Sequence, residues 1–225
     1  MGCAKKRSPM LVGLCGRSGS GKGYVSEMFY ARGIPSIDTD AVYRKLTAPS
    51  DELSPCMAEL VGRFGTAVAC EDNSLNRAVM RSLVFGEDKK ALADLDRISH
   101  RHILAETERM AKELKKNGSD IVLIDAPLLF ESGFDKKCAK IIAVTASETT
   151  VVRRIMRRDG ISEDAARARL KTQIPAEELA SRADYVIVND GDDEAMIKVI
   201  DECVASLRVE AEKTKNHRRN REKTK

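Results

Sequence analysis

Five short apolar runs constrain the fold of this chain more than any other feature. Each run is flanked by turn residues, and long segments with helical spacing separate the runs from one another. The runs lack polar alternation, which is typical of strands buried on both faces of a parallel sheet. The intervening segments are long enough for crossover helices, so we expect a three-layer α/β/α fold. The runs cover residues 10–15, 34–38, 121–125, 141–145 and 185–189.

About eighty residues separate the second and third runs, too many for a single crossover. Helical patterns at 54–63, 77–85 and 89–116 fill this stretch, and Asn117-Gly118-Ser119 ends it. We expect a helical substrate-binding insert at 41–116. A second helical stretch, interrupted at Asp159-Gly160, predicts a lid at 147–175. The core domain then comprises residues 10–40, 117–146 and 176–208.

The net charge of +4 arises from the two ends of the chain. Residues 211–225 carry seven Lys or Arg against two Glu, and Lys5, Lys6 and Arg7 lie near the start. Neither end has an apolar period, so 1–9 and 209–225 are interpreted as basic, flexible tails. Aromatic residues make up only 4% with no Trp, which argues against a stacking surface for nucleic acid.

Six cysteines occur with no C-x-x-C pair and no histidine at metal-ligand spacing. This pattern indicates free thiols in a reducing compartment, and we expect a cytoplasmic enzyme. Gly13, Gly16 and Arg17 interrupt the first apolar run, so neither a signal peptide nor a membrane span is expected. A monomer is the expected oligomeric state.

A glycine-rich loop follows the first apolar run. It reads Gly16-Arg17-Ser18-Gly19-Ser20-Gly21-Lys22, which fits the first seven places of G-x-x-x-x-G-K-[ST]. Glycines let backbone N–H groups converge on phosphate oxygens, and the next helix presents its positive end. The loop, with Gly23 and Tyr24 after it, is the predicted ATP site, where Lys22 would bridge the β- and γ-phosphates.

Gly23 breaks this motif, because Ser or Thr there would offer a hydroxyl to Mg²⁺. One interpretation is a non-catalytic relative that binds nucleotide poorly. The favoured interpretation is that a water or a carboxylate takes this position, since Mg²⁺ normally keeps several waters.

Acidic and amide side chains follow several of the predicted strands. Asp38 and Asp40 follow the second strand, Asp125 ends the third and Asn189 ends the fifth. Parallel strands end at one edge of a sheet, so these groups should face the glycine-rich loop. Asp40 is the candidate base for an acceptor hydroxyl, with Asp38 in support. Asp125 and Asp38 are the candidate Mg²⁺ ligands, although a helix cap or a turn would also explain an aspartate here.

The chain resembles the dephospho-CoA kinase family from Met10 to about Leu207. The resemblance depends on the glycine-rich loop, the D-x-D-x-x-x-R segment, the P-L-L-F-E segment, an arginine-rich lid and a late A-D-x-x-I-x-N segment. The matching residues are Gly16 to Lys22, Asp38, Asp40, Arg44, Phe64, Gly65, Leu75 to Arg77, Val84, Phe85, His100, Pro127 to Glu131, Arg154, Arg158, Arg169, Gln173, Ala183, Asp184 and Asn189.

This resemblance implies transfer of a phosphoryl group from ATP to the ribose 3′-hydroxyl of dephospho-CoA. It implies that Asp40 is the catalytic base, and that Arg154 and Arg158 close over the phosphates from the lid. Asn189 would meet the adenine. The implied contacts to dephospho-CoA are Arg44, Arg77, His100, Pro127, Leu128 and Leu129. Arg101 follows His100 where the family often has proline, so the resemblance does not assign the backbone turn at this position.

Three other functions stay open. The chain could be a kinase for another small hydroxyl substrate, although the insert and P-L-L-F-E match the dephospho-CoA enzymes better. It could be a nucleotide-dependent switch, but the guanine-reading N-K-x-D is replaced by Asn189-Asp190-Gly191-Asp192. The third is the non-catalytic relative suggested by Gly23.

Overall fold

The computed structural model describes residues 8–223, without the side chains of 215 and 217–223. The chain forms two compact units. The core unit comprises Met1–Ile37 and Ala111–Lys225, and the insert unit comprises Asp38–Met110. The sequence predicted the insert at 41–116 and a separate lid at 147–175, and the residues of that lid belong to the core unit. The expectation of a tail over residues 1–7 lies outside the described residues.

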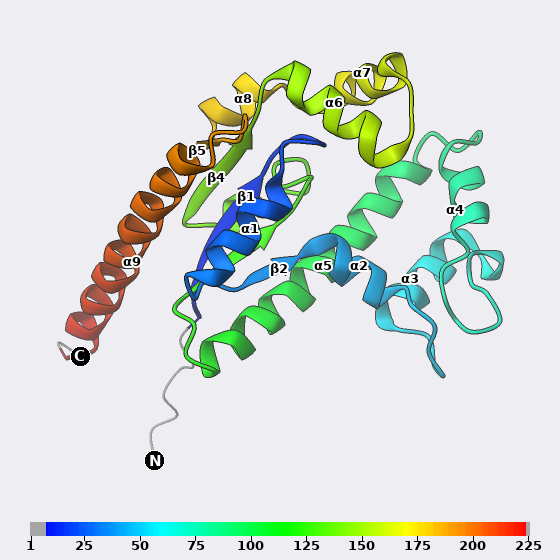
Figure 1. Ribbon diagram of the computed structural model, residues 1–225. Coiled ribbons are helices and arrows are strands. Elements are labelled where there is room, and N and C mark those ends of the chain that lie inside the picture. Colours follow the sequence, from blue (N-terminus) through cyan, green and yellow to red (C-terminus); the bar gives the residue numbers. More distant parts are fainter. Residues whose placement is uncertain (1–7, 224–225) are drawn as a thin grey trace. The chain divides into compact units, whose positions relative to one another are not determined.

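A five-stranded sheet forms the centre of the core unit (Figure 1). Its order is β2-β3-β1-β4-β5. β1 is parallel to β3 and β4, and β4 is parallel to β5, with Leu14 of β1 opposite Asp125 and Ile142. This arrangement confirms the predicted parallel sheet. The strands are β1 (Met10–Cys15), β2 (Ser36–Asp38), β3 (Ile121–Asp125), β4 (Lys140–Thr145) and β5 (Tyr185–Val188).

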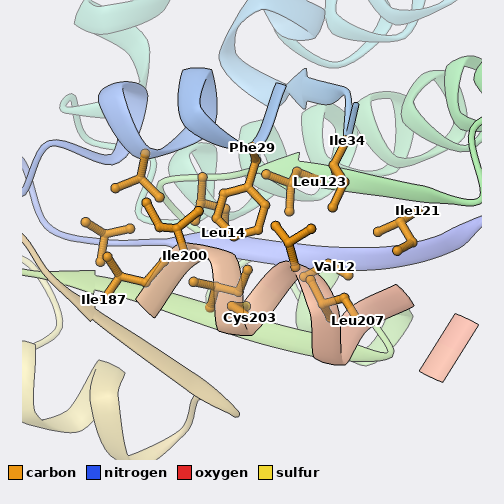
Figure 2. Close-up of a cluster of buried hydrophobic side chains, with 14 of the residues drawn as sticks. Val12, Leu14, Phe29, Ile34, Ile121, Leu123, Ile187, Ile200, Cys203 and Leu207 are labelled. Atoms are coloured by element: carbon orange, nitrogen blue, oxygen red, sulfur yellow. The ribbon is translucent and has the colours of Figure 1, made fainter. Parts of the chain in front are cut away.

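The main hydrophobic core lies between the sheet and two helices, α1 (Lys22–Ala31) and α9 (Asp193–Lys223) (Figure 2). Phe29 of α1 and Leu207 of α9 are fully buried there, together with Leu14 of β1. The cluster thus joins one strand that precedes the glycine-rich loop to the helix that follows it. The loop is therefore held at both of its ends by buried apolar side chains.

A short segment after β3 closes against β1. Leu129 is fully buried, and a Cβ added at Gly13 would lie 2.7 Å from its Cδ2 atom. The 3₁₀ helix η2 (Phe134–Lys137) follows, with Phe134 buried. Glycine at position 13 thus allows the P-L-L-F-E segment to approach the strand closely.

The predicted lid is helical. It contains α6 (Glu148–Asp159) and α7 (Glu163–Lys171), and α8 (Ala176–Ser181) follows. Gly160 ends α6 in the left-handed region, with φ of 65°, where glycine is favoured. Val151, Ile155 and Leu170 form a small core between the two lid helices.

The insert unit has a hydrophobic core of its own. Met57, Leu60 and Ile98 are fully or almost fully buried in it. Ser54 and Asn76 cap the second and third of its helices by accepting from Met57 N and Val79 N. The unit contains α2 (Thr39–Leu46), α3 (Pro55–Phe64), the 3₁₀ helix η1 (Thr66–Val68), α4 (Arg77–Val84) and α5 (Ala91–Lys116) as far as Met110.

The end of the chain differs from the sequence prediction. α9 continues to Lys223, and Ala211 is buried in the main core, so residues 209–223 are helical rather than the expected flexible tail. The interpretation as a tail overlooked Ala211, which extends the buried face formed by Cys203, Val204 and Leu207 by one turn, whereas Val209 is exposed. Among the described helices, none is both long and apolar enough to cross a membrane.

Candidate active site

The loop between β1 and α1 is shaped to bind an anion through its backbone. Gly19 and Gly21 have φ of 81° and 87°, which glycine adopts without strain. Gly21 is also the N-cap of α1 and makes no side-chain cap hydrogen bond. The first N–H groups of a helix have no acceptor in a preceding turn and carry its positive end, so the start of α1 is suited to an anion. This geometry fits the predicted phosphate-binding loop, Gly16 to Lys22, here named the phosphate cradle.

Lys22 forms an ion pair with Asp125 at the end of β3. Their side chains are only 16% and 13% exposed, so the pair lies largely out of solvent. This contact brings together two of the predicted site residues from separate strand ends. In the described part of the chain, no three His, Cys, Asp or Glu side chains are grouped to hold a metal, so Asp125 is a single candidate ligand.

The surroundings of Gly23 are open. A Cβ added there would meet no atom within 4 Å. The next residue, Tyr24, has a side chain that is 44% exposed. The position therefore has room for a larger side chain or for a small ligand beside the start of α1.

Two lid arginines reach the glycine-rich loop. Arg158 donates to Ser18 Oγ at 3.2 Å, and Arg154 donates to the carbonyl oxygens of Gly19 and Ser20 at 3.4 Å. The two arginines lie four residues apart on one face of α6, as the sequence predicts. Their expected contacts with ATP stay predictions.

Asn189 is buried beside the loop, with 5% of its surface exposed. Its Nδ2 donates to Ser20 O at 2.9 Å, and its Oδ1 accepts from Arg154 at 3.3 Å. Both ends of its amide are thus bound within the core unit. The adenine contact implied by the resemblance is not supported by these contacts.

The end of α7 makes two contacts with the loop that the sequence did not predict. Gln173 Oε1 accepts from Ser18 N at 2.9 Å, and Arg17 donates to Leu170 O at 2.7 Å. Gln173 was only a matching position in the resemblance, and no local signal relates it to a loop 155 positions away. The lid is therefore joined to the cradle at both of its helices.

Asp190 joins β5 to the start of α6. It accepts from Ser147 N and from Ser147 Oγ, at 2.8 and 2.9 Å. These hydrogen bonds, that of the backbone N–H first, hold the pKa of Asp190 below its usual range. The contact fixes the point at which the lid leaves the sheet.

Cys15 precedes the loop and is buried. Burial raises the pKa of its thiol to about 11, although nearby Lys22 acts in the opposite direction. The thiol is therefore protonated at neutral pH and is a poor nucleophile.

The D-x-D-x-x-x-R segment begins α2 in the insert unit. Asp38 is the N-cap of α2: its Oδ1 accepts from Asp40 N and Ala41 N, at 2.8 and 3.1 Å. Its Oδ2 accepts from Arg44 at 3.3 Å. The capping role considered for Asp38 is thus confirmed, and its oxygens are poorly suited to a direct Mg²⁺ contact. Asp40 is exposed, and within the described residues its carboxylate forms no ion pair.

The other predicted substrate contacts of the insert unit lie on α4 and α5. Arg77 is exposed at the start of α4 and acts electrostatically on Tyr43. Burial raises the pKa of the Tyr43 phenol. His100 is half-buried on α5, directly after Ser99. Tyr43 of α2 thus lies close to Arg77 of α4 and to Ser99 of α5.

The P-L-L-F-E segment divides between surface and core. Pro127 and Leu128 are exposed, the latter by 51%. Leu129 is fully buried against Gly13, so the expected substrate contact is not supported for this residue. Two consecutive leucines cannot be told apart by local pattern, because both are apolar.

Comparison with known proteins gives the family. The family model described as "Dephospho-CoA kinase" matches residues 10–194. The dephospho-CoA kinase of Syntrophotalea carbinolica is 40% identical over 182 residues, which are 81% of this chain and 84% of that protein. The dephospho-CoA kinase of Bacillus cereus strain ATCC 10987 is 37% identical over 182 residues, which are 81% and 89% of the two chains.

Solved structures agree with this match. The crystal structure of TT1252 from Thermus thermophilus has a TM-score of 0.70 and 26% identity, with 91% of this chain and 98% of that chain covered. The dephospho-CoA kinase from Campylobacter jejuni has a TM-score of 0.62 and 25% identity, with 88% and 96% covered. The chain therefore belongs to the dephospho-CoA kinase family, whose members phosphorylate dephospho-CoA with ATP in the last step of coenzyme A biosynthesis.

Proposed function

We propose that this chain transfers the γ-phosphoryl group of ATP to the 3′-hydroxyl of the ribose of dephospho-CoA, giving coenzyme A and ADP. The observation that carries the proposal is the family match, which extends from β1 through β5 and includes both the cradle and the insert. The cradle supports it, because a glycine-rich loop before a helix, with a lysine paired to a carboxylate, suits a triphosphate.

The proposed base is Asp40. Its backbone N–H is bound by Asp38, which fixes the first turn of α2, while its carboxylate stays exposed. A carboxylate so held can accept the proton of the 3′-hydroxyl as the hydroxyl oxygen attacks the γ-phosphorus. Arg44 and Arg77 are proposed to bind the anionic groups of dephospho-CoA, and His100 to position it.

Mg²⁺ is the proposed cofactor, and the donor set fits it in part. Asp125 supplies a carboxylate beside Lys22, and the open surroundings of Gly23 suit the waters that Mg²⁺ keeps. The ion would neutralise charge on the β- and γ-phosphates. Lys22 and the N–H groups of α1 hold the same phosphates from the protein side. Monomeric state and cytoplasmic location stay predictions.

One assay tests the proposal. Purified protein with ATP and Mg²⁺ is offered dephospho-CoA, AMP or gluconate, and ADP release is followed. We expect turnover with dephospho-CoA, and Asp40→Asn should lower kcat by about 10²- to 10⁴-fold with ATP affinity retained. Asp51→Asn removes an exposed carboxylate elsewhere in the insert unit and should leave kcat unchanged.

The other outcomes identify the alternatives. Turnover with AMP or gluconate in place of dephospho-CoA would indicate a kinase for another substrate. Nucleotide binding without acceptor-dependent turnover would favour a switch or a non-catalytic relative, and the proposal would then be wrong.

A further inference from the structure

The side chain of Asn189 faces the glycine-rich loop from inside the core unit. It follows β5, and its backbone N–H donates to Thr145 O at the end of β4 at 2.8 Å. The backbone of Asn189 is thus fixed by the sheet. Its buried Nδ2 donates to Ser20 O at 2.9 Å, across 169 positions of sequence. This places a rigid donor against one particular carbonyl of the loop.

Arg154 supports the same arrangement from α6. It donates to Asn189 O at 3.0 Å and to Asn189 Oδ1 at 3.3 Å. The second of these contacts orients the amide, because an oxygen that accepts from a guanidinium leaves the Nδ2 group to face the loop. Arg154 also donates to Ser20 O at 3.4 Å. Two side chains thus hold a single carbonyl oxygen.

The fit between Asn189 and the loop requires glycine at position 21. A Cβ added to Gly21 would lie 2.0 Å from Asn189 Nδ2. The Ser20–Gly21 peptide and the Asn189 amide are therefore in direct contact, with no room for a side chain between them. A nucleotide base could not reach this side of the amide without displacing the loop.

The planarity of the peptide unit gives this contact a consequence for the ligand. In a trans peptide, the C=O of one residue and the N–H of the next point in opposite directions. When Ser20 O is held inward by Asn189, the N–H of Gly21 must point outward, to the side where α1 begins. A flip of this peptide would present a carbonyl oxygen to the bound phosphate instead.

We propose that Asn189, oriented by Arg154, is a positioning residue that fixes the Ser20–Gly21 peptide so that its N–H faces the triphosphate. The proposal rests on the proposed function, since it concerns ATP as the phosphoryl donor. It assigns Asn189 to the phosphate cradle instead of to the adenine. Asn189 should then contribute equally to the affinity for every ligand that carries a triphosphate, whatever its base.

The test compares three ligands that share a triphosphate and differ in the base. Affinities for ATP, GTP and inorganic tripolyphosphate, each with Mg²⁺, are measured by titration calorimetry for the wild type and Asn189→Ala. We expect the variant to weaken all three by the same factor, roughly tenfold, because the buried carbonyl of Ser20 loses the nearer of its two donors. The KM for ATP should rise similarly, while the KM for dephospho-CoA stays unchanged. Val188→Ala alters a side chain that is 56% exposed at the end of the same strand, and should change none of these values.

A second variant covers the case in which Asn189→Ala does not fold. Asn189→Asp keeps the shape and the acceptor for Arg154 but cannot donate to Ser20 O, so tripolyphosphate affinity should again fall. Wild-type tripolyphosphate affinity in either folded variant would overturn the proposal. Loss of ATP affinity alone would assign Asn189 to the base. If the wild-type protein binds ATP but does not phosphorylate dephospho-CoA, the proposed function is wrong. The role of Asn189 in triphosphate binding is unaffected by that result.

Discussion

Single residues of the glycine-rich loop differ sharply in the space around them. Gly21 has a positive φ and touches the Asn189 amide, whereas Gly23 is surrounded by open space and has no positive φ. Both are glycines of one motif, two positions apart. Only position 21 must be glycine, because of its positive φ and its contact with Asn189.

Gly21→Ala should therefore abolish most nucleotide binding. The added Cβ would lie 2.0 Å from Asn189 Nδ2, and alanine disfavours the left-handed region. We expect ATP affinity to fall at least tenfold, measured by calorimetry. Gly23→Ala is the matched control, with the same added methyl group, and should bind ATP as the wild type does. Equal loss in both variants would contradict this account.

At the scale of elements, the lid depends on charge contacts as well as on its small core. Asp159 at the end of α6 accepts from Arg158 Nε at 2.8 Å and pairs with Arg169 of α7. Val151, Ile155 and Leu170 pack between the same helices. The carboxylate thus fixes both the end of α6 and its approach to α7.

The lid should lose this stabilisation in acid. The hydrogen bond from Arg158, and next that from Arg169, lower the pKa of Asp159 to about 2 from an ordinary value near 3.8. A carboxyl group with a lowered pKa stabilises the folded state above its unfolded pKa, and the effect disappears as pH falls through the folded pKa. The stability difference between wild type and Asp159→Asn, from denaturant unfolding, should be constant above about pH 4 and shrink toward pH 2.

Asp164→Asn is the matched control for this titration. It removes an exposed carboxylate in the first turn of α7 that forms no ion pair with any described residue. Its stability relative to wild type should show little change over the same pH range. A difference for Asp159→Asn that persists unchanged at pH 2 would contradict the assignment.

At the scale of the whole molecule, the two units have separate hydrophobic cores. Leu14 and Leu207 belong to the core around the sheet, and Leu60 belongs to the core of the insert unit. The contacts of the cradle described above lie within the core unit. Asp38, Asp40 and Arg44 lie in the insert unit. A change in one core should therefore affect one kind of ligand more than the other.

Leu60→Ala should destabilise the insert unit and spare the cradle. Leu60 is fully buried, so truncation should lower stability by about 2–5 kcal/mol. We expect the KM for dephospho-CoA to rise while ATP affinity stays within twofold of wild type. Leu53→Ala, at a position that is 39% exposed in the same unit, is the control. An equal loss of ATP affinity in Leu60→Ala would contradict the separation of the two cores.

Local sequence determined the elements and the cradle of this protein. Apolar runs without alternation gave the strands within two residues at each end, and Gly16 to Lys22 marked the turn from β1 to α1, because both depend on neighbours in the chain. Tertiary structure alone decided which side chains hold the loop. Asn189 meets Ser20 across 169 positions and Gln173 meets Ser18 across 155, and no pattern within a segment encodes such a pairing. It also buried Leu129 beside exposed Leu128, and extended α9 beyond residue 209, since burial depends on the neighbours that the fold supplies.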